Sequence, residues 1–288
     1  MEKKYSKDGS TGASIHARRA IAYIVLILVS ILCLFWFYLL IITATRSNAE
    51  LSKGFTLLPS SHLLENWNNL VAGDLPIVSG MINSIIVASA STVLCVYFSA
   101  LTAYAIHAYE FKARKFMFKF ILMIMMIPGQ VGALGFVKLI VRLGMDDTFW
   151  PLILPAIASP VTFFYIKQYM QSALPLSLVE AARMDGGGEI YIFNRIVLPL
   201  MKPAIAVQAI FSFVGSWNNY FTPALILHSS EKKTLPVLIA LLRGADFLKF
   251  DMGQVYVMIA FSIFPVIVVY LILSKFIVQG VALGSVKG

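Results

Sequence analysis

The sequence predicts an all-α polytopic membrane protein with six transmembrane helices, and three observations predict it. Hydrophobic residues make up 59% of the 288 residues and charged residues only 13%, whereas a soluble domain carries about a quarter charged residues. The apolar residues gather in six runs, each long enough for the about 20 residues with which a helix crosses a bilayer. Lys and Arg concentrate in the segments on one side of these runs, as the positive-inside rule expects.

The six predicted spans follow the apolar runs and the prolines that interrupt them. They cover about Ile21–Thr45, Val78–His107, Phe116–Val141, Phe149–Gln171, Met201–Leu227 and Val255–Ile277. The first run is longer than the about 7–15 apolar residues of a signal peptide, so we interpret it as a retained span. Pro128-Gly129 predicts a kink in the third span, and Pro151, Pro155 and Pro160 predict an irregular first half of the fourth.

The predicted organisation is one membrane domain between two tails. Residues 1–19 form a polar, disordered N-terminal tail, residues 20–280 the six-span domain, and residues 281–288 the C-terminal tail. Six spans put both termini on one side. If that side is the cytoplasm, it carries 15 Lys and Arg against six Asp and Glu, while the outer side carries eight of each. The excess of basic residues is therefore explained by the orientation of the chain in a lipid bilayer, and we expect no nucleic acid partner.

The segment of about residues 172–200, on the predicted cytoplasmic side, has the pattern of a helix-turn-helix. Pro175 can open a helix over Leu176–Arg183, and the three glycines of Gly186–Gly188 end it, because glycine tolerates the left-handed turn of a helix terminus. A second short helix is expected from Glu189 to about Leu198, before Pro199 redirects the chain. Such an element between spans is typical of a docking site rather than a spacer.

Motifs for catalysis, nucleotide binding or metal binding are missing from the sequence. There is no Gly-x-x-x-x-Gly-Lys-Ser/Thr loop, no His-Glu-x-x-His and no Gly-x-Ser-x-Gly. We therefore predict no enzyme, and no catalytic, cofactor-binding or metal site on this chain. The predicted spans hold no Asp or Glu in their centres, which disfavours an ion-coupled carrier. A stand-alone secondary carrier or channel for small polar solutes stays open, because backbone carbonyls can also bind sodium.

One spacing pattern resembles a known coupling motif. Glu180-Ala181-Ala182 is followed after three residues by Gly186, with Asp185 before it, and after nine more by Ile196-x-Leu198-Pro199. This resembles the Glu-Ala-Ala motif of permease subunits in bacterial ABC importers. Gly187-Gly188 departs from the Ala or Ser that the family often has there.

Further motifs are similar to the carbohydrate-uptake branch of that family, including its six-span maltose-system permease subunit. They are Asn83-Ser84, Thr102-Ala103-Tyr104-Ala105, Met126-Ile127-Pro128, Trp217-Asn218-Asn219-Tyr220-Phe221, Thr234-Leu235-Pro236 and the ending Gly280 with Gly284-Ser285-Val286-Lys287-Gly288. The resemblance extends over nearly the whole chain from about residue 20.

This resemblance implies the type I ABC importer permease fold and a transport role. The chain would be a permease subunit of an ATP-driven, binding-protein-dependent importer of oligosaccharides or related glycosides, in the bacterial cell membrane with cytoplasmic termini. Its implied partners are a second homologous permease subunit in a heterodimer, two ATP-binding subunits that use ATP and Mg²⁺, and an extracytoplasmic sugar-binding protein. The implied ATPase-coupling residues are Glu180, Ala181, Ala182, Arg183, Asp185, Gly186 and Pro199.

Sugar binding needs aromatic faces and amide groups, which gives a set of substrate-path candidates. They are Asn83, Gln130, Trp217, Asn218, Asn219 and Tyr220. Asn and Gln can instead join helices by hydrogen bonds, which we favour for Asn83 and Gln130. For Trp217 to Tyr220 both interpretations stay open, because these groups are expected within one helical turn. The outer loops around Asn66–Asn69 and Arg243–Asp251 are candidate docking surfaces for the binding protein.

Overall fold

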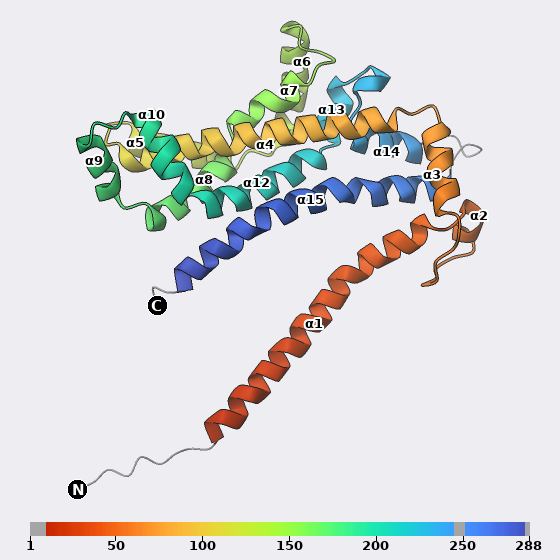
Figure 1. The fold of residues 1–288 in the computed structure, drawn as a ribbon. Helices are drawn as coiled ribbons and strands as arrows, with labels where there is room; N and C mark the ends of the chain where they lie inside the picture. Colours follow the sequence, from red (N-terminus) through yellow and green to blue (C-terminus); the bar gives the residue numbers. More distant parts are fainter. Residues whose placement is uncertain (1–9, 245–250, 286–288) are drawn as a thin grey trace. The chain divides into compact units, whose positions relative to one another are not determined.

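The computed structural model describes residues 10–244 and 251–285, and every regular element in this part of the chain is helical (Figure 1). The chain divides into two compact units, one of residues 1–69 with 251–260 and one of residues 70–250 with 261–288. The predicted outer loop at Arg243–Asp251 falls largely on residues 245–250, outside the described residues. The same holds for residues 1–9 and 286–288 of the two predicted tails.

The first unit contains α1 (Ser10–Ala44), α2 (Asn48–Leu51), most of α3 (Leu63–Ala72) and the start of α15 (Met252–Ser285). The prediction of a disordered tail up to residue 19 is wrong from Ser10 onward, because α1 already begins there. The basic end of that segment continues the helix of the first apolar run without a break. The candidate docking loop around Asn66–Asn69 is helical and belongs to α3.

The end of α1 is closed by a side chain from α3. A helix leaves its last carbonyls without intrahelical partners, and the Asn66 amide nitrogen donates to the carbonyls of Ala44 at 3.1 Å and Arg46 at 2.8 Å. Asn66 is only 3% exposed, and a Cβ at Gly253 would lie 2.7 Å from its amide. Asn66 is therefore a structural residue, and within the candidate docking loop Asn66–Asn69 only Asn68 and Asn69 are exposed.

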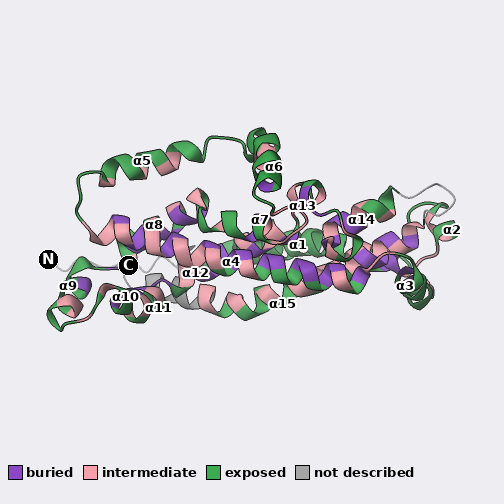
Figure 2. Ribbon diagram, turned by 90° about the horizontal axis from the view of Figure 1, so that it is seen from above, coloured by how far each residue is buried: buried purple, intermediate pink, exposed green. Residues whose placement is uncertain are grey.

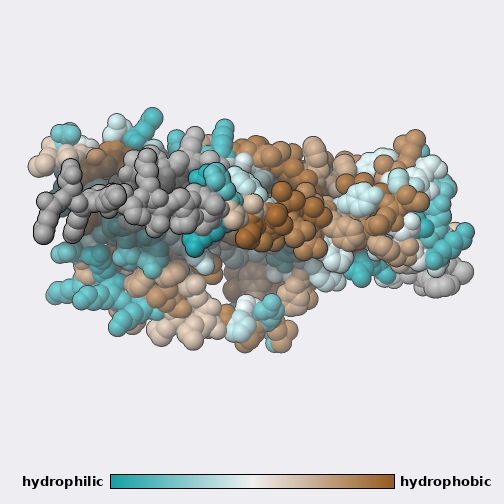
Figure 3. Space-filling model, turned by 90° about the horizontal axis from the view of Figure 1, so that it is seen from below, coloured by the Kyte–Doolittle hydropathy of each residue, from teal (hydrophilic) through white to brown (hydrophobic). Residues whose placement is uncertain are grey.

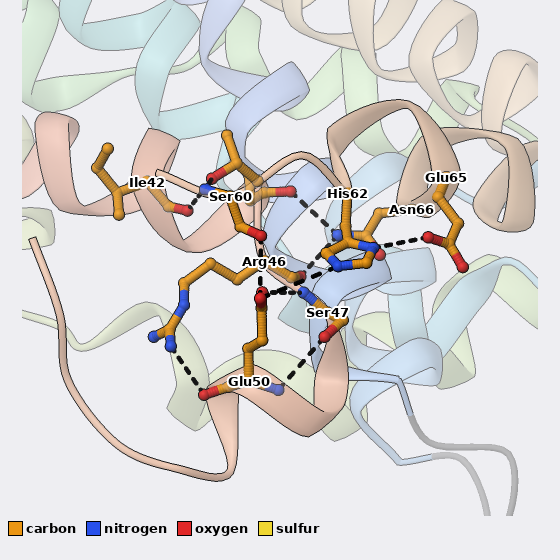
Figure 4. A network of polar contacts seen from close by, with 10 residues as sticks. Ile42, Arg46, Ser47, Glu50, Ser60, His62, Glu65 and Asn66 are labelled. Atoms are coloured by element: carbon orange, nitrogen blue, oxygen red, sulfur yellow. Dashed lines mark hydrogen bonds and ion pairs between the residues drawn. The ribbon is translucent and has the colours of Figure 1, made fainter. Parts of the chain in front are cut away.

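A polar network beside this closure joins α2 to α3 (Figure 4). Ser47 caps α2 by accepting from the Glu50 amide at 3.3 Å, while the Glu50 carboxylate accepts from the Ser47 amide at 3.2 Å. Ser60 donates to the other Glu50 oxygen at 3.0 Å. The His62 ring lies 2.7 Å from a Glu65 oxygen, and this hydrogen bond raises the pKa of His62. The network fixes the path of the loop between α2 and α3.

The second unit is built around α4 (Ile77–Ala108), which matches the predicted second span. α8 (Pro160–Ala173) and α12 (Lys202–Trp217) pack along α4, and the buried residues lie where these helices meet (Figure 2). The first half of the fourth span is irregular, as predicted. It consists of α7 (Trp150–Ile153) and the 3-10 turn η2 (Leu154–Ile157) before α8 begins.

Two predicted spans are broken more sharply than expected. α5 (Arg114–Ile124) is followed by the 3-10 turn η1 (Gly129–Gly132) and α6 (Ala133–Arg142), across a bend of 87°. Pro128 is extended, with φ −61° and ψ 127°, and it also lacks an amide donor, so the helix cannot continue through it. The expected fifth span ends its first helix, α12, at Trp217, and α13 (Phe221–Ile226) follows only after a break.

The predicted six spans equal the upper count that the described helices allow, although one of the two bent pairs joins residues 189–200 to α12 and not α12 to α13. Four described helical segments are long and apolar enough to cross a membrane, and up to six if each of two bent pairs is one span. The remaining elements of the second unit before α15 include η4 (Ser230–Lys232) and α14 (Leu235–Arg243). The helix of the sixth span, α15, runs on to Ser285 and so extends into the predicted C-terminal tail.

The outer surface is apolar over large areas, as Figure 3 shows for one face. Large hydrophobic side chains are exposed along α1, α5 and α15, among them Leu32, Trp36, Phe116, Leu271 and Ile272. A surface of this kind is unsuited to water. It fits helices that face lipid or a partner subunit.

Asn66 offers a test of the closure of α1. We expect Asn66→Ala to speed amide exchange in residues 42–50 about tenfold, because the carbonyls of Ala44 and Arg46 lose a donor worth about 1–3 kcal/mol. Hydrogen exchange with mass spectrometry of the purified protein measures this. Asn68→Ala, which alters an exposed amide of the same helix, is the matched control. Equal exchange rates in both variants would contradict the role of Asn66.

Candidate functional site

The predicted helix-turn-helix of residues 172–200 is present. Pro175 precedes α9 (Leu176–Met184) in an extended conformation, with φ −64° and ψ 133°. The chain then turns at Gly186, whose φ of +83° lies in the left-handed region, where glycine carries no steric cost. The second helix consists of α10 (Glu189–Ile192), a π-helical segment η3 (Phe193–Val197) and α11 (Leu198–Leu200).

Of the two glycines that follow Gly186, one is explained by close packing across the turn. The Gly187 amide donates to the Ala182 carbonyl at 3.0 Å. A Cβ at Gly187 would lie 2.8 Å from that oxygen and 3.3 Å from a side-chain carbon of Ile192. Gly188 has φ −68° and open space around it. This chain therefore needs glycine at 187, whereas position 188 accepts other residues.

One side of the segment is anchored and the other is exposed. Val179 and Ile192 are buried in the core of the second unit, with Ala182 packed against them. Glu180, Ala181 and Asp185 are exposed, and Met184 is 83% exposed. We call the exposed set Glu180, Ala181, Met184, Asp185 and Ile190 the coupling surface. Among the described residues the Glu180 carboxylate has no hydrogen bond or ion pair, so its charge is available to a partner.

Arg183 does not belong to that surface. Its Nε donates to a Glu189 oxygen at 2.6 Å, and its guanidinium lies 5.0 Å from the centre of the Tyr109 ring. Arg183, one of the implied coupling residues, is thus bonded within the described part of the chain, whereas Glu180 is not. The hydrogen bond to Glu189 raises the pKa of Arg183, and burial raises the pKa of Tyr109. The second Glu189 oxygen accepts from the Tyr104 hydroxyl of α4 at 2.9 Å.

Pro199 marks the exit from the segment. It lies near the start of α11 and is exposed. The chain bends by 82° between this part and α12, at the buried residue Met201. The coupling segment is thus joined to the following membrane helix by a sharp corner.

Two of the substrate-path candidates share a cavity. Gln130 of η1 and Asn219, after α12, line a space of about 520 Å³. The other lining residues come from α6, α7, η2 and α13, and include Phe136, Phe221 and Thr222. The structure thus places Gln130 on a cavity wall, exposed, and not between packed helices. Amide and hydroxyl groups beside aromatic rings are the composition expected of a sugar site.

The other candidates lie elsewhere. The Asn83 amide donates to the carbonyls of Glu231 at 2.7 Å and Lys233 at 3.1 Å, so the expected role in joining segments is confirmed. Trp217 is 3% exposed and stacks on Phe213 with ring centres 5.8 Å apart. Because α12 ends at Trp217, the expectation that Trp217 to Tyr220 share one helical turn is wrong. Asn218 and Tyr220 are exposed outside the cavity.

A polar node around Asp147 was missed by the sequence analysis. Asp147 has a positive φ of 54°, a conformation that Asp tolerates better than most residues. Its carboxylate accepts from the amides of His228 at 2.9 Å and Ser229 at 3.1 Å, and from Lys232 Nζ at 3.0 Å. The Ser229 hydroxyl and then Lys232 hold the pKa of Asp147 well below its usual range. The only signal in the sequence was the tight loop after Gly144.

The geometry can be compared with known proteins. The family described as binding-protein-dependent transport system inner membrane component matches residues 96–283. The arabinooligosaccharides transport system permease protein AraQ of Bacillus subtilis is 35% identical over 267 residues, covering 91% of this chain and 93% of that protein. The sn-glycerol-3-phosphate transport system permease protein UgpE of Brucella abortus is 32% identical over 269 residues, covering 90% of this chain and 94% of that protein.

A solved structure shows the same fold. The crystal structure of a bacterial ABC transporter involved in the import of the acidic polysaccharide alginate contains a chain with a TM-score of 0.73 to this one. The match covers 95% of this chain and 99% of that chain at 22% sequence identity. The predicted fold class is confirmed.

Gly186 and Gly188 allow a matched test of the turn. We expect Gly186→Val to destabilise the end of α9 by about 1–2 kcal/mol or more, because a β-branched residue resists positive φ. Amide exchange in residues 180–188 should then rise about tenfold. Gly188→Val is the control, since that backbone conformation suits any residue. A similar increase in both variants would argue against a left-handed turn at Gly186.

Proposed function

The chain belongs to the family of inner membrane components of binding-protein-dependent transport systems and is a permease subunit of an ABC importer, not an enzyme; we propose that its cargo is an oligosaccharide or a related glycoside. The observation that carries the proposal is the uncharged cavity between η1 and the break after α12. Membership of this family replaces the alternative of a stand-alone carrier or channel, which the sequence had left open.

The cavity favours a neutral polyol over a phosphate ester. The described residues that line it include Gln130, Asn219 and Thr222 as hydrogen-bonding groups, and none of them is charged. A glycerol phosphate, which the Brucella relative is named for, carries a charge that Arg or Lys side chains would be expected to balance. Sugar hydroxyls need only amides and hydroxyls, and Phe136 and Phe221 supply flat apolar faces. The name of the Bacillus relative, for arabinooligosaccharides, is consistent with this choice.

The coupling surface is proposed to dock one of two ATP-binding subunits. Its free Glu180 carboxylate would meet a basic residue there, and Ala181 would allow close approach of the helix, while Ala182 packs on the chain's own core. Asp185 and Gly186 end α9 in a tight turn, and Arg183 and Pro199 hold the segment to the rest of the chain. ATP and Mg²⁺ would be bound and used by those subunits, with no cofactor on this chain. A rigid docked segment can convert their closure into movement of the attached helices.

The remaining partners and the orientation follow from the same proposal. A second homologous permease subunit would complete a heterodimer, and an extracytoplasmic sugar-binding protein would deliver the cargo to the outer loops. The concentration of the net charge of +9 on the side of the coupling segment supports cytoplasmic termini. The setting would be the plasma membrane of a bacterium, the inner one where an outer membrane is also present.

Charge reversal tests the docking role. We expect Glu180→Lys to abolish ATP-dependent uptake and to reduce the ATPase that co-purifies in mild detergent about thirtyfold, since breaking a buried interfacial ion pair costs about 2 kcal/mol or more. The protein should still insert, because Glu180 supports no contact within the described chain. Asp74→Lys, at an exposed carboxylate on the predicted outer side, is the control. Normal co-purification with Glu180→Lys would falsify the assigned role.

Neighbouring asparagines test the cargo site. We expect Asn219→Ala and Gln130→Ala each to reduce uptake of arabino-oligosaccharides about fivefold, because each loses a hydrogen bond worth about 1 kcal/mol to a sugar hydroxyl. Asn218→Ala should leave uptake unchanged, since that exposed amide lies outside the cavity. Uptake into reconstituted vesicles, with sn-glycerol 3-phosphate as the competing probe, measures both. Equal effects at 218 and 219, or preferred uptake of the phosphate ester, would contradict a neutral sugar path.

A further inference from the structure

α4 is tied by polar side chains at both of its ends to segments of the second unit that lie far apart. One end contacts α10 and η3 of the coupling segment, and the other contacts η4 and α14 (Figure 1). The helix has 32 residues, which corresponds to roughly 48 Å at 1.5 Å per residue. The two sets of contacts are therefore separated by most of the thickness of a bilayer.

At the first end, a single carboxylate joins α4 to both helices of the coupling segment. Glu189 of α10 accepts from the Tyr104 hydroxyl of α4 at 2.9 Å and from Arg183 Nε of α9 at 2.6 Å. Tyr104 is 2% exposed, and its ring lies 5.7 Å from that of Phe193 in η3. Hydrogen bonds to an ionised group are stronger than neutral ones, and a buried hydroxyl without a partner is costly. We call these two bonds the inner clamp.

At the second end, two side chains of α4 hold the loop before α14. The Asn83 amide donates to two carbonyls of that loop, those of Glu231 and Lys233, and the Leu235 amide donates to the Ser84 hydroxyl at 2.8 Å. Asn83 is 9% and Ser84 3% exposed. The same loop is fixed from its other side by Asp147 through His228, Ser229 and Lys232. We call the bonds from Asn83 and Ser84 the outer clamp.

The part of α4 between the clamps has no point at which it could bend freely. From Asn83 to Tyr104 it contains neither proline nor glycine, the usual sites of helix kinks. Ala88, Ala100 and Ala103 are fully buried, so neighbouring helices pack directly against the backbone there. The Ser91 hydroxyl adds a bond to the Leu152 carbonyl at 3.2 Å. A displacement at one end is thus carried to the other.

We propose that α4 is the rigid link by which movement of the coupling segment reaches the outer loop of residues 228–235, with Tyr104 and Glu189 as the positioning residues at the inner clamp. This inference rests on the proposed docking of an ATPase subunit on the coupling surface. Glu180 would contact the ATPase subunit, whereas Glu189 would transmit the displacement to α4 through its bond with Tyr104. The two carboxylates of one short segment therefore have separate tasks, one facing the partner and one facing the chain.

The test follows the outer loop while the ATPase closes. The complete complex, with its partner permease and ATPase subunits, is reconstituted in lipid nanodiscs. Amide exchange of residues 228–235 is then measured with and without ATP, Mg²⁺ and vanadate. In the wild type, trapping should change exchange in this loop. Tyr104→Phe removes one bond, and Glu189→Gln leaves one acceptor oxygen for two donors. Each should reduce the response about tenfold, while vanadate still inhibits the ATPase. Tyr165→Phe, at an exposed tyrosine of α8, should respond as the wild type does.

Further outcomes separate a mechanical role from structural damage. The double variant Tyr104→Phe with Glu189→Gln should lose no more of the response than Glu189→Gln alone, because both changes break the same bond. Asn83→Ala should abolish the response with the inner clamp intact. A full response in Tyr104→Phe and Glu189→Gln, or additive losses in the double variant, would overturn this inference. The proposed function would not be affected by that result. A wild-type complex without a bound ATPase would instead overturn the proposed function and this inference with it.

Discussion

The packing of α4 against α8 and α12 is the contact on which the other features of the second unit depend. Small side chains make it possible, since Ala88, Ala100 and Ala103 leave no exposed surface and let the helix axes approach. Aromatic residues of the same helix then reach outward to the coupling segment, with Tyr97 and Tyr104 both against Phe193. A bulky residue in the alanine series would separate the helices and displace every polar contact that α4 makes along its length.

The coupling surface and the cavity differ in chemistry in the way their proposed ligands do. The coupling surface combines an unpaired carboxylate with exposed apolar side chains such as Met184 and Ile190, as expected of a contact between proteins. The cavity of Gln130 and Asn219 has amide groups without charge, which suits a cargo that must bind weakly and leave again. Neither surface needs a metal or a bound cofactor to do what is proposed for it.

The sequence predicts the features that depend on local rules. Apolar runs locate the spans, and the spacing from Glu180 to Pro199 locates the coupling segment, including the left-handed turn at Gly186. Long-range pairing is not visible in this way. Arg183 turns inward to the Glu189 carboxylate and to the ring of Tyr109, which lies far earlier in the chain. Gln130 and Asn219 line one cavity although they are far apart in the sequence, and proline predicts a bend at 128 without setting its angle of 87°.

The node at Asp147 has a consequence for protein engineering. The loop of residues 144–149 is short and partly exposed, and it would be a natural place for an epitope tag or a fluorescent fusion in studies of membrane orientation. The backbone of this loop is fixed, however, by two sets of hydrogen bonds. The Asp147 amide donates to the Ile226 carbonyl at 3.1 Å, and the Asp147 carboxylate accepts from the loop after α13. An insertion there would break these hydrogen bonds and release both the loop of residues 144–149 and the loop after α13.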